Sequence, residues 1–253
     1  MSDAEPLPKG TKPDGTSNEA EVSQHVREMF TRIAPRYDLL NHLLSGQMDR
    51  LWRARTATEL APILQREGAM ALDLCCGTGD LAFALQRKAK ARVVGADFSH
   101  TMLVRAKAKA RTANGAAGVP LFEADALRLP FMDGAFDLVT AAFGFRNLAN
   151  YEQGLREILR VLKTGGIVSI LEFAEPAPGL LGEAYRFYAR TLLPKIGGWI
   201  SGDADAYAYL PKSVARFFRP EEFAVLMRQL GFREVRYRLM TFGAVALHLG
   251  IKP

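Results

Sequence analysis

Residues 71–80 decide the fold, and they read Ala71-Leu72-Asp73-Leu74-Cys75-Cys76-Gly77-Thr78-Gly79-Asp80. A short, mostly apolar run leads into two closely spaced glycines, and residues 81–89 then carry apolar side chains at helical spacing. This pattern predicts a strand, a glycine turn and a helix. The glycines allow a ligand to approach the backbone closely, and the start of the helix offers unpaired N–H groups. We therefore expect this turn to bind a ligand.

Similar apolar runs recur on both sides of this turn and alternate with amphipathic helices. Continuous apolar strands separated by helices are typical of a parallel sheet covered on both faces. The five predicted strands are Ala69–Leu74, Arg92–Asp97, Pro120–Asp125, Phe136–Phe143 and Gly166–Phe173, and the helices between them include Leu81–Ala89, Thr101–Arg111 and Leu155–Leu162.

The C-terminal part of the chain predicts the end of this sheet. A helix over Pro220–Leu230 precedes two more strands, Glu234–Met240 and Ala244–Ile251, joined by a short turn around Gly243. Strands joined by so short a turn pair antiparallel. The prediction is thus an α/β fold whose seven-stranded, mostly parallel sheet ends in an antiparallel hairpin.

The remaining segments predict one domain with a tail and a lid. Residues 1–22 are polar and aperiodic, which is typical of a disordered tail, and residues 23–253 form the domain. Residues 23–66 have helical periodicity, with a second helical stretch over Asp38–Leu64, and predict a helical cap. Residues 176–219 interrupt the alternation and predict a helical lid over the carboxyl edge of the sheet.

Composition and charge narrow the class of protein. The chain has 253 residues, a formal charge of +6 and two cysteines, which are adjacent and cannot build a disulfide framework. Residues 1–24 hold two basic and five acidic side chains, so the rest carries +9, a balance that favours nucleic acid or an anionic membrane as partner. With no apolar segment of spanning or signal type, we expect a cytoplasmic protein.

Two carboxylates strengthen the prediction of a ligand site at the glycine turn. Asp97 ends the second strand, 18 residues after Gly79, where a carboxylate can accept both hydroxyls of a ribose, and Asp125 ends the third. We therefore expect a nucleoside cofactor. Gly77, Gly79 and Ala82 also satisfy a dinucleotide pattern, which keeps a dehydrogenase as an alternative. Against it stand the helical segment before the turn, the lack of a Tyr-x-x-x-Lys pair and the antiparallel hairpin.

That combination resembles the class I methyltransferases, which bind S-adenosylmethionine (SAM) on a Rossmann-like fold. Five blocks narrow the resemblance to the ubiquinone/menaquinone biosynthesis C-methyltransferases, and together they span about residues 23–252. The blocks are Tyr37-Asp38-Leu39-Leu40-Asn41-His42-Leu43-Leu44-Ser45, Phe143-Gly144-Phe145-Arg146-Asn147, residues 160–173, Gly202-Asp203-Ala204-Asp205-Ala206-Tyr207-Ala208-Tyr209-Leu210 and Gly243-Ala244-Val245-Ala246-Leu247-His248.

The chain departs from the family pattern at a few positions. The family commonly has Met at the position of Leu40, His at Asp49 and Pro at Thr164. Asp49 can still make a polar contact, but it cannot act as a neutral imidazole. Some members also use a serine where this chain has Ala142.

The resemblance implies a cofactor site and a reaction. It places Thr78, between Gly77 and Gly79, beside the methionine part of SAM, Asp97 on the ribose, and Asp125 with Ala126 around adenine. The reaction implied is transfer of the SAM methyl group to a ring carbon of a polyprenylated quinol. The family includes enzymes acting on naphthoquinols, benzoquinols or both, and of these we favour demethylmenaquinol.

Three residues are candidates for catalysis and three more for holding the substrate. Carbon becomes a good nucleophile only when an adjacent hydroxyl is deprotonated, so Arg146 is a candidate for stabilising the phenolate or orienting a water. The alternative for Arg146 is a structural ion pair. Tyr37 and Asn41 lie where the cap closes over the substrate, although a buried anchor and a helix-internal hydrogen bond are equally compatible. The lid candidates are Asp203, Tyr207 and Tyr209; we assign no metal site.

The lid also suggests where the protein would bind a polyprenyl tail and contact a membrane. Its apolar residues could form a groove for the tail, and its neighbouring basic residues suit anionic headgroups, although packing within the lid is the alternative. We expect peripheral contact with the inner face of an anionic membrane, while oligomeric state, including a homodimer, stays open. The apolar set is Phe187, Tyr188, Leu192, Leu193, Ile196, Trp199 and Ile200, and the basic set is Arg186, Arg190 and Lys195.

Two competing functions have to be considered. A nucleic-acid methyltransferase would suit the basic charge, but the segment after the fourth strand lacks an Asn/Asp-Pro-Pro-aromatic block and both cysteines lie in the glycine turn. Nucleic acid is therefore not the expected partner. A non-catalytic SAM-binding scaffold in a quinone-synthesis assembly is the other alternative, since a cofactor pocket alone does not establish turnover.

Overall fold

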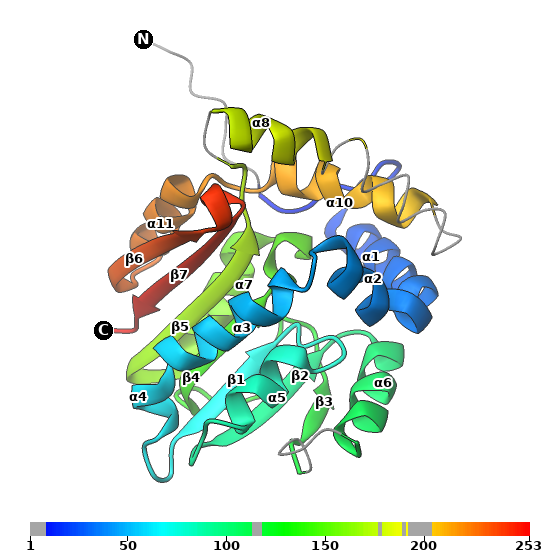
Figure 1. Cartoon of the computed structure of the whole chain (residues 1–253). Coiled ribbons are helices and arrows are strands. Elements are labelled where there is room, and N and C mark those ends of the chain that lie inside the picture. Colours follow the sequence, from blue (N-terminus) through cyan, green and yellow to red (C-terminus); the bar gives the residue numbers. More distant parts are fainter. Residues whose placement is uncertain (1–8, 113–117, 177–178, 189–190, 192–203) are drawn as a thin grey trace.

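The computed structural model describes residues 9–112, 118–176, 179–188, 191 and 204–253 and places seven strands in one sheet (Figure 1). The strand order is β3-β2-β1-β4-β5-β7-β6. The strands are β1 (Met70–Leu74), β2 (Arg92–Asp97), β3 (Leu121–Glu123), β4 (Phe136–Ala142), β5 (Leu162–Phe173), β6 (Arg233–Met240) and β7 (Val245–Ile251).

The pairing of the strands confirms the predicted mixed sheet. β1 pairs parallel with β2 and β4, while β7 pairs antiparallel with both β5 and β6. The chain runs outward from β1 to β3 and then returns to place β4 on the other side of β1. This reversal leaves a crevice at the carboxyl ends of β1 and β4, which is where open α/β sheets bind ligands.

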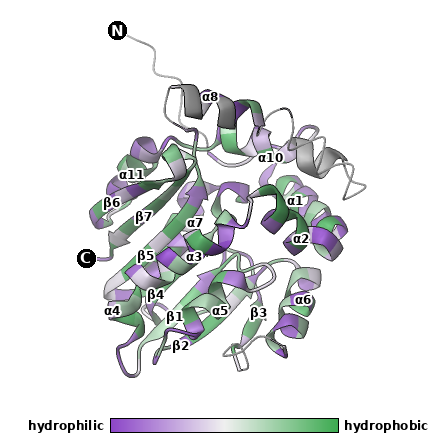
Figure 2. Ribbon diagram, viewed as in Figure 1, coloured by the Kyte–Doolittle hydropathy of each residue, from purple (hydrophilic) through white to green (hydrophobic). Residues whose placement is uncertain are grey.

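Helices cover both faces of the sheet because successive strand residues point to opposite sides. Leu72 and Leu74 pack with α7 (Tyr151–Val161) and α11 (Pro220–Gln229) on one face. Ala71 points to the other face, which α3 (Met48–Glu59), α4 (Ala61–Leu64) and α5 (Asp80–Gln86) cover. α6 (His100–Ala110) packs beside β2 and β3. Hydrophobic residues accordingly concentrate along the central strands (Figure 2).

A second layer of helices lies across the carboxyl edge of the sheet. It contains α1 (Glu19–Ile33), the short η1 (Ala34–Arg36), α2 (Tyr37–Leu44), α8 (Leu180–Phe187) and α10 (Ala204–Arg216) (Figure 1). A small apolar cluster joins α1 and α2 to Tyr188, Tyr209 and Leu210. The predicted cap and lid therefore meet each other above the glycine turn.

A disordered tail was expected over residues 1–22; residues 1–8 lie outside the described residues, and residues 9–22 contact the rest of the domain. The Thr11 backbone N–H donates to the Leu148 carbonyl at 2.8 Å, and the Lys9 carbonyl accepts from the Tyr151 N–H. α1 begins at Glu19, where the Asn18 side chain caps it. This segment is thus anchored beside the loop after β4 by long-range backbone hydrogen bonds, which composition does not reveal.

The helical stretch predicted over residues 38–64 is three helices, not one. Gly46 and Gln47 both have positive φ, which ends α2 and starts α3 in a new direction. α4 then starts at Ala61, with Pro62 in its first turn, after a second break at Leu60. The first break turns α3 under the cap, so that one side of it faces the site described below.

Smaller differences concern strand ends and connections. β3 is only three residues long, β5 begins at Leu162, earlier than predicted, and β4 ends at Ala142 because Phe143 has a φ of 59°. The turn between β6 and β7 contains the short η4 (Thr241–Gly243). Within the described ranges, no helix combines the length and apolar character needed to cross a bilayer.

Candidate active site

The glycine turn places backbone where a ligand can reach it. Gly77 and Gly79 have φ values of 55° and 87°, and α5 begins immediately after them. A side chain at Gly79 would lie 2.5 Å from the Phe83 ring, whereas one at Gly77 would meet nothing within 4 Å. Gly79 is therefore required by packing, and Gly77 leaves open space beside the backbone.

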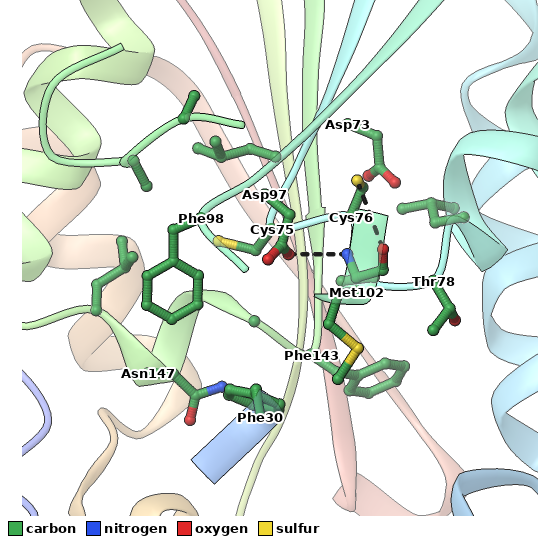
Figure 3. A pocket seen from close by; sticks show the side chains of 18 of the residues that line it. Phe30, Asp73, Cys75, Cys76, Thr78, Asp97, Phe98, Met102, Phe143 and Asn147 are labelled. Atoms are coloured by element: carbon green, nitrogen blue, oxygen red, sulfur yellow. Dashed lines mark hydrogen bonds between the residues drawn. The ribbon is translucent and has the colours of Figure 1, made fainter. Parts of the chain in front are cut away.

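Asp97 points its carboxylate at this turn from the end of β2 (Figure 3). One carboxylate oxygen accepts the Gly77 N–H at 2.8 Å, and the other accepts the Ser99 N–H at 2.8 Å. Burial raises the pKa of Asp97 to about 6. Each oxygen keeps a further lone pair, so the side chain is able to accept hydrogen bonds from the two hydroxyls of a ribose.

The residues around Asp97 enclose what we call the glycine-turn pocket. Phe98 and Met102 contribute apolar side chains to its lining (Figure 3). Asp125 and Ala126 lie in the same lining, and the Asp125 carboxylate accepts the Leu127 N–H at 2.9 Å. Asp125 therefore stabilises the turn that borders the pocket, and as a lining residue it can also contact a ligand.

Counting only the residues that the structure describes, two buried polar atoms without a hydrogen-bond partner belong to side chains that line this pocket. Asp73 lies in β1, and one of its carboxylate oxygens accepts the Thr140 hydroxyl at 2.7 Å while the other has no partner. Burial raises the pKa of Asp73 to about 7. The Asn147 side-chain amide nitrogen is also without a partner. Buried polar atoms need partners, so both atoms suit hydrogen bonds to a ligand.

Thr78 lines the glycine-turn pocket and also connects the cap helix α2 to it. Its hydroxyl donates to the Asp38 carboxylate of α2 at 2.5 Å. Lys109 of α6 pairs with the same carboxylate at 2.9 Å and with Asp80 at the start of α5. The cap helix α2 is thus tied to the turn through charged hydrogen bonds, which are stronger than neutral ones.

A second cavity, the cap pocket, lies between the cap and the loop after β4. It encloses about 390 Å³, within the roughly 300–1,000 Å³ common for small-molecule sites. Its lining is mostly apolar, with side chains from α1, α2, α3, α10 and β5. Four residues line both cavities, so the two meet at a shared wall: Phe30, Tyr37, Arg53 and Phe143.

Three of the predicted cap and lid residues line the cap pocket. Burial raises the pKa of the Tyr37 phenol, which is hydrogen-bonded to Asn41. The Tyr209 hydroxyl bonds the Thr11 hydroxyl at 2.8 Å and donates to the Asn147 side-chain oxygen at 3.1 Å. Tyr209 therefore connects the N-terminal segment, α10 and the loop after β4.

The other lid candidates are not placed at the site. Asp203 lies outside the described residues, as do Arg190, Leu192, Leu193, Lys195, Ile196, Trp199 and Ile200. Tyr207 lies in α10, and its side chain is not described.

Arg146 lines the cap pocket but is already paired. Its guanidinium lies 2.8 Å from the Glu172 carboxylate, and the two side chains are 7% and 1% exposed. It also donates to the Phe143 carbonyl at 2.5 Å and lies over the Phe173 ring. The geometry is that of the structural ion pair, and a role in catalysis has to be exerted through this pair.

Asp49 lies at the start of α3 and also lines the cap pocket. Its carboxylate bonds His42 Nδ1 at 2.7 Å, the Ser45 hydroxyl at 2.8 Å and the Arg53 guanidinium at 2.5 Å. Burial acts to raise the pKa of Asp49, but Arg53 and the neighbouring hydrogen bonds outweigh it and hold that pKa below its usual range. An imidazole is thus present beside the position where the resembled family commonly has His.

Several residues at the two pockets were not selected as site residues from the sequence: Asp73, Phe98, Met102, Asn147, Arg53 and Glu172. Two of them carried a signal. Asn147 ends the block after β4, and Glu172 is the one acidic residue of the apolar run Gly166–Phe173. A lone carboxylate in a buried strand requires a cationic partner, which could have indicated the pair with Arg146.

Comparison with known proteins gives the family directly. Residues 17–252 match the model of the ubiE/COQ5 methyltransferase family. The chain is 53% identical to the demethylmenaquinone methyltransferase of Thermus thermophilus, covering 89% of this chain and all of that protein. It is 48% identical to the enzyme of the same name from Deinococcus radiodurans, covering 92% and 94%. It is 43% identical to the ubiquinone/menaquinone biosynthesis C-methyltransferase UbiE of Geobacter sulfurreducens, covering 92% and 90%.

Solved structures agree on the fold. A SAM-dependent methyltransferase of Thermotoga maritima superposes with a TM-score of 0.60 at 22% identity, covering 89% of this chain and 99% of that one. The cyclase SpnF gives a TM-score of 0.65 at 20% identity, covering 98% of both chains. Because this fold carries more than one chemistry, it does not define the reaction. The family match does, and the chain belongs to the ubiE/COQ5 family of SAM-dependent methyltransferases.

Proposed function

We propose that the protein transfers the methyl group of SAM to a ring carbon of demethylmenaquinol, giving menaquinol. The observation that carries this proposal is the shared wall between an acidic pocket and an apolar one. A charged nucleoside cofactor fits the first, and an aromatic ring with an isoprenoid tail fits the second. The methyl donor and the ring carbon would have to meet where the two pockets border each other, beside Tyr37, Arg53 and Phe143.

The residues of the glycine-turn pocket fit SAM chemically. Asp97 would hold the ribose hydroxyls, and the unpartnered Asp73 oxygen and Asn147 amide supply an acceptor and a donor for the remaining polar groups. The excess of carboxylates in the lining suits a cofactor with positive charge. When bound, SAM supplies a methyl group on a positively charged sulfur.

The cap pocket supports a quinol in place of a nucleic-acid base. Its polar groups are few and mostly paired with each other, so an apolar ring and tail can bind without stranding charges. Tyr37 remains a neutral hydroxyl because burial raises its pKa, and it can donate to a quinol oxygen. Asn41, in the same lining, offers a second polar contact.

The relatives favour a naphthoquinol over a benzoquinol. The proteins from Thermus and Deinococcus, at 53% and 48% identity, are named for demethylmenaquinone, whereas the 43% identical Geobacter protein is named for both quinones. We therefore place demethylmenaquinol first and the 2-methoxy-6-polyprenyl-1,4-benzoquinol precursor of ubiquinone second.

We also propose that the protein works in the cytoplasm and docks on the inner face of an anionic membrane to reach its substrate. Exposed apolar side chains lie at or next to residues that line the cap pocket. Leu43 is itself part of the lining, Phe187 precedes Tyr188, and Phe242 follows Thr241. They are 53%, 60% and 69% exposed. If liposomes with anionic lipid fail to retain the protein at low salt, this docking proposal is wrong.

The test of the function is a transfer assay. Purified protein is incubated in detergent with methyl-labelled SAM and chemically reduced demethylmenaquinone, with the benzoquinol precursor in a parallel reaction. We expect label to enter the organic phase with demethylmenaquinol, and more slowly with the benzoquinol. SAM binding without any transfer would instead support the non-catalytic scaffold.

A further inference from the structure

Three side chains form a hydrogen-bonded row that runs from the N-terminal segment to the wall of the glycine-turn pocket. They are Thr11, Tyr209 of α10, and Asn147 at the end of the short helix η2 (Phe145–Asn147). The Thr11 and Tyr209 hydroxyl oxygens lie 2.8 Å apart, and the Tyr209 hydroxyl donates to the Asn147 side-chain oxygen at 3.1 Å. Thr11 and Asn147 are buried, and burial raises the pKa of Tyr209, so its hydroxyl keeps its proton.

The row has one direction, because a hydroxyl group has a single proton to donate. The Tyr209 proton goes to Asn147, so Thr11 has to donate the bond between Thr11 and Tyr209. The Asn147 oxygen therefore faces Tyr209, and the Asn147 amide nitrogen has no hydrogen-bond partner among the described residues. Since Asn147 lines the glycine-turn pocket (Figure 3), this nitrogen is available to donate to a bound ligand.

The N-terminal segment also packs against the backbone that follows Asn147. Besides the bond from the Thr11 N–H to the Leu148 carbonyl, a side chain on Gly10 would lie 1.9 Å from the Ala149 carbonyl oxygen. Leu148 and Ala149 line the glycine-turn pocket next to Asn147. The segment therefore supports this wall of the pocket from outside, at a distance that only glycine allows at position 10.

We propose that Tyr209 and Thr11 are positioning residues for the cofactor: they hold the Asn147 amide so that its nitrogen donates a hydrogen bond to SAM. This inference rests on SAM occupying the glycine-turn pocket, as proposed above, and it does not depend on the identity of the methyl acceptor. Thr11 lies outside residues 17–252, the part of the chain that matches the family model. The family match therefore does not account for the Thr11 end of the row.

The first variant is Tyr209→Phe, which removes the hydroxyl and keeps the ring that lines the cap pocket. The Asn147 amide is then no longer fixed with its nitrogen towards the cofactor. We expect the Kd of SAM, measured by isothermal titration calorimetry without quinol, to rise about tenfold, the effect of one hydrogen bond. The matched control is Tyr188→Phe. The Tyr188 hydroxyl donates to the Leu44 carbonyl at 2.8 Å, and its side chain lines the cap pocket but not the glycine-turn pocket, so SAM affinity should stay unchanged.

The second variant is Thr11→Val, which has a similar shape but cannot donate to the Tyr209 oxygen. Tyr209 can still donate to Asn147 in this variant, so we expect a smaller loss of SAM affinity, about threefold. Thr11→Ser keeps the hydroxyl and should bind SAM as the wild type does. The matched control is Thr16→Val in the same segment, because the Thr16 hydroxyl donates locally to the Pro13 carbonyl at 2.7 Å. It should leave SAM affinity unchanged.

A double-variant cycle separates positioning from a general structural role. Asn147→Ala removes the amide that is proposed to contact SAM and should weaken SAM binding by itself. Because Tyr209 acts through Asn147, adding Tyr209→Phe to Asn147→Ala should cause no further loss of affinity. Losses that add in the double variant would contradict the proposed path from Tyr209 through Asn147 to the cofactor.

The outcomes separate this inference from the proposed function. A protein that binds SAM but methylates neither quinol would overturn the function, while the SAM affinities of the variants still decide the inference. If Asp97→Ala binds SAM as tightly as the wild type, SAM does not occupy the glycine-turn pocket, and the inference is wrong with that placement. Weaker binding in Asp97→Ala with unchanged binding in Tyr209→Phe overturns the inference alone. If Tyr209→Phe does not fold, Thr11→Val and Thr11→Ser decide, and equal affinities of these two contradict the role of Thr11.

Discussion

The two pockets that meet at Phe143 differ in whether their polar groups are paired. Within the described part of the chain, the Asp97 carboxylate in the glycine-turn pocket is held by two backbone N–H groups, and one atom each of Asp73 and Asn147 has no hydrogen-bond partner. In the cap pocket, the charged groups are paired with each other, as in Arg146 with Glu172 and Arg53 with Asp49. The first pocket can therefore form hydrogen bonds to a polar ligand. The second can bind an apolar ligand without leaving a charge unpaired.

This difference is a consequence of what each pocket has to bind. A polar cofactor can supply the missing hydrogen-bond partners. Hydrogen bonds to the unpaired atoms then contribute to the affinity and specificity for that cofactor. A quinol with a hydrocarbon tail offers few partners, so each unpaired charge in its pocket would cost free energy on binding. Residues of the cap pocket therefore have to be tested in pairs, and residues of the glycine-turn pocket can be tested singly.

Breaking an ion pair in the cap pocket should have the largest effect, and the quantity affected is the stability of the fold. We expect Arg146→Ala to lower the free energy of unfolding by about 3–5 kcal/mol, because Glu172 is left as an uncompensated buried charge. Urea denaturation followed by circular dichroism measures this loss. Adding Glu172→Gln removes the stranded charge and should restore part of the stability.

The control for this variant is an arginine in an exposed ion pair. Arg238 lies 3.2 Å from Glu59 and is 68% exposed. Exposed pairs contribute about 0–1 kcal/mol, so Arg238→Ala should unfold close to wild type. Equal losses in both arginine variants would contradict the contrast between buried pairing in the cap pocket and ordinary surface pairing. Turnover of Arg146→Ala has to be measured at a temperature where the variant is folded.

The same contrast explains what could be predicted from the sequence. The seven-stranded sheet was predictable, and with it the placement of Asp97 and Thr78 at one pocket, because the motifs are contiguous and because parallel strands bring their carboxyl ends to one edge. The wall shared by the two pockets could not be predicted, since Arg53 and Phe143 lie 90 residues apart and meet only through tertiary packing.

The cap was harder to predict because its geometry depends on local breaks and long-range partners. Gly46 and Gln47 adopt a left-handed turn inside a stretch with continuous helical periodicity, and that turn brings His42 to Asp49. Glycine alone indicates such a break only weakly, and Gln has no preference for positive φ. The pairing of Arg146 with Glu172 likewise could be identified only from the fold. The ion pair that the sequence left open as the alternative for Arg146 was correct.

Removing an unpaired group from the glycine-turn pocket should have the next largest effect. We expect Asp97→Ala to weaken SAM binding about 100-fold, because two hydrogen bonds to a charged acceptor are lost. Isothermal titration calorimetry measures the affinity for SAM, and the affinity of the cap pocket for 1-naphthol, a redox-stable fragment of the proposed quinol, should stay unchanged. Asp133→Asn, an exposed carboxylate paired with Arg160, is the control and should bind SAM normally. A loss of both affinities in Asp97→Ala would mean that the two pockets do not act separately.

Lowering the pH should reproduce a milder form of the same defect. Burial raises the pKa of Asp97 to about 6, so the carboxylate that would hold the ribose becomes protonated below that pH. We expect SAM affinity to be about tenfold weaker at pH 5 than at pH 8. Because Asp73 titrates higher, at about 7, Asp73→Asn separates its contribution, and Asp97→Asn should flatten the dependence between pH 5 and 6.

The sign of the stability change distinguishes this effect from acid unfolding. The raised pKa means that the folded protein binds the Asp97 proton more tightly than the unfolded chain does. This group therefore adds to the free energy of unfolding of the ligand-free protein as the pH falls from 6 towards 4. The stabilisation that SAM provides should shrink over the same range, because less SAM is bound. Thermal melts with and without SAM at pH 5 and 8 measure both changes, and a constant SAM-induced shift would show that Asp97 does not hold the cofactor as a carboxylate.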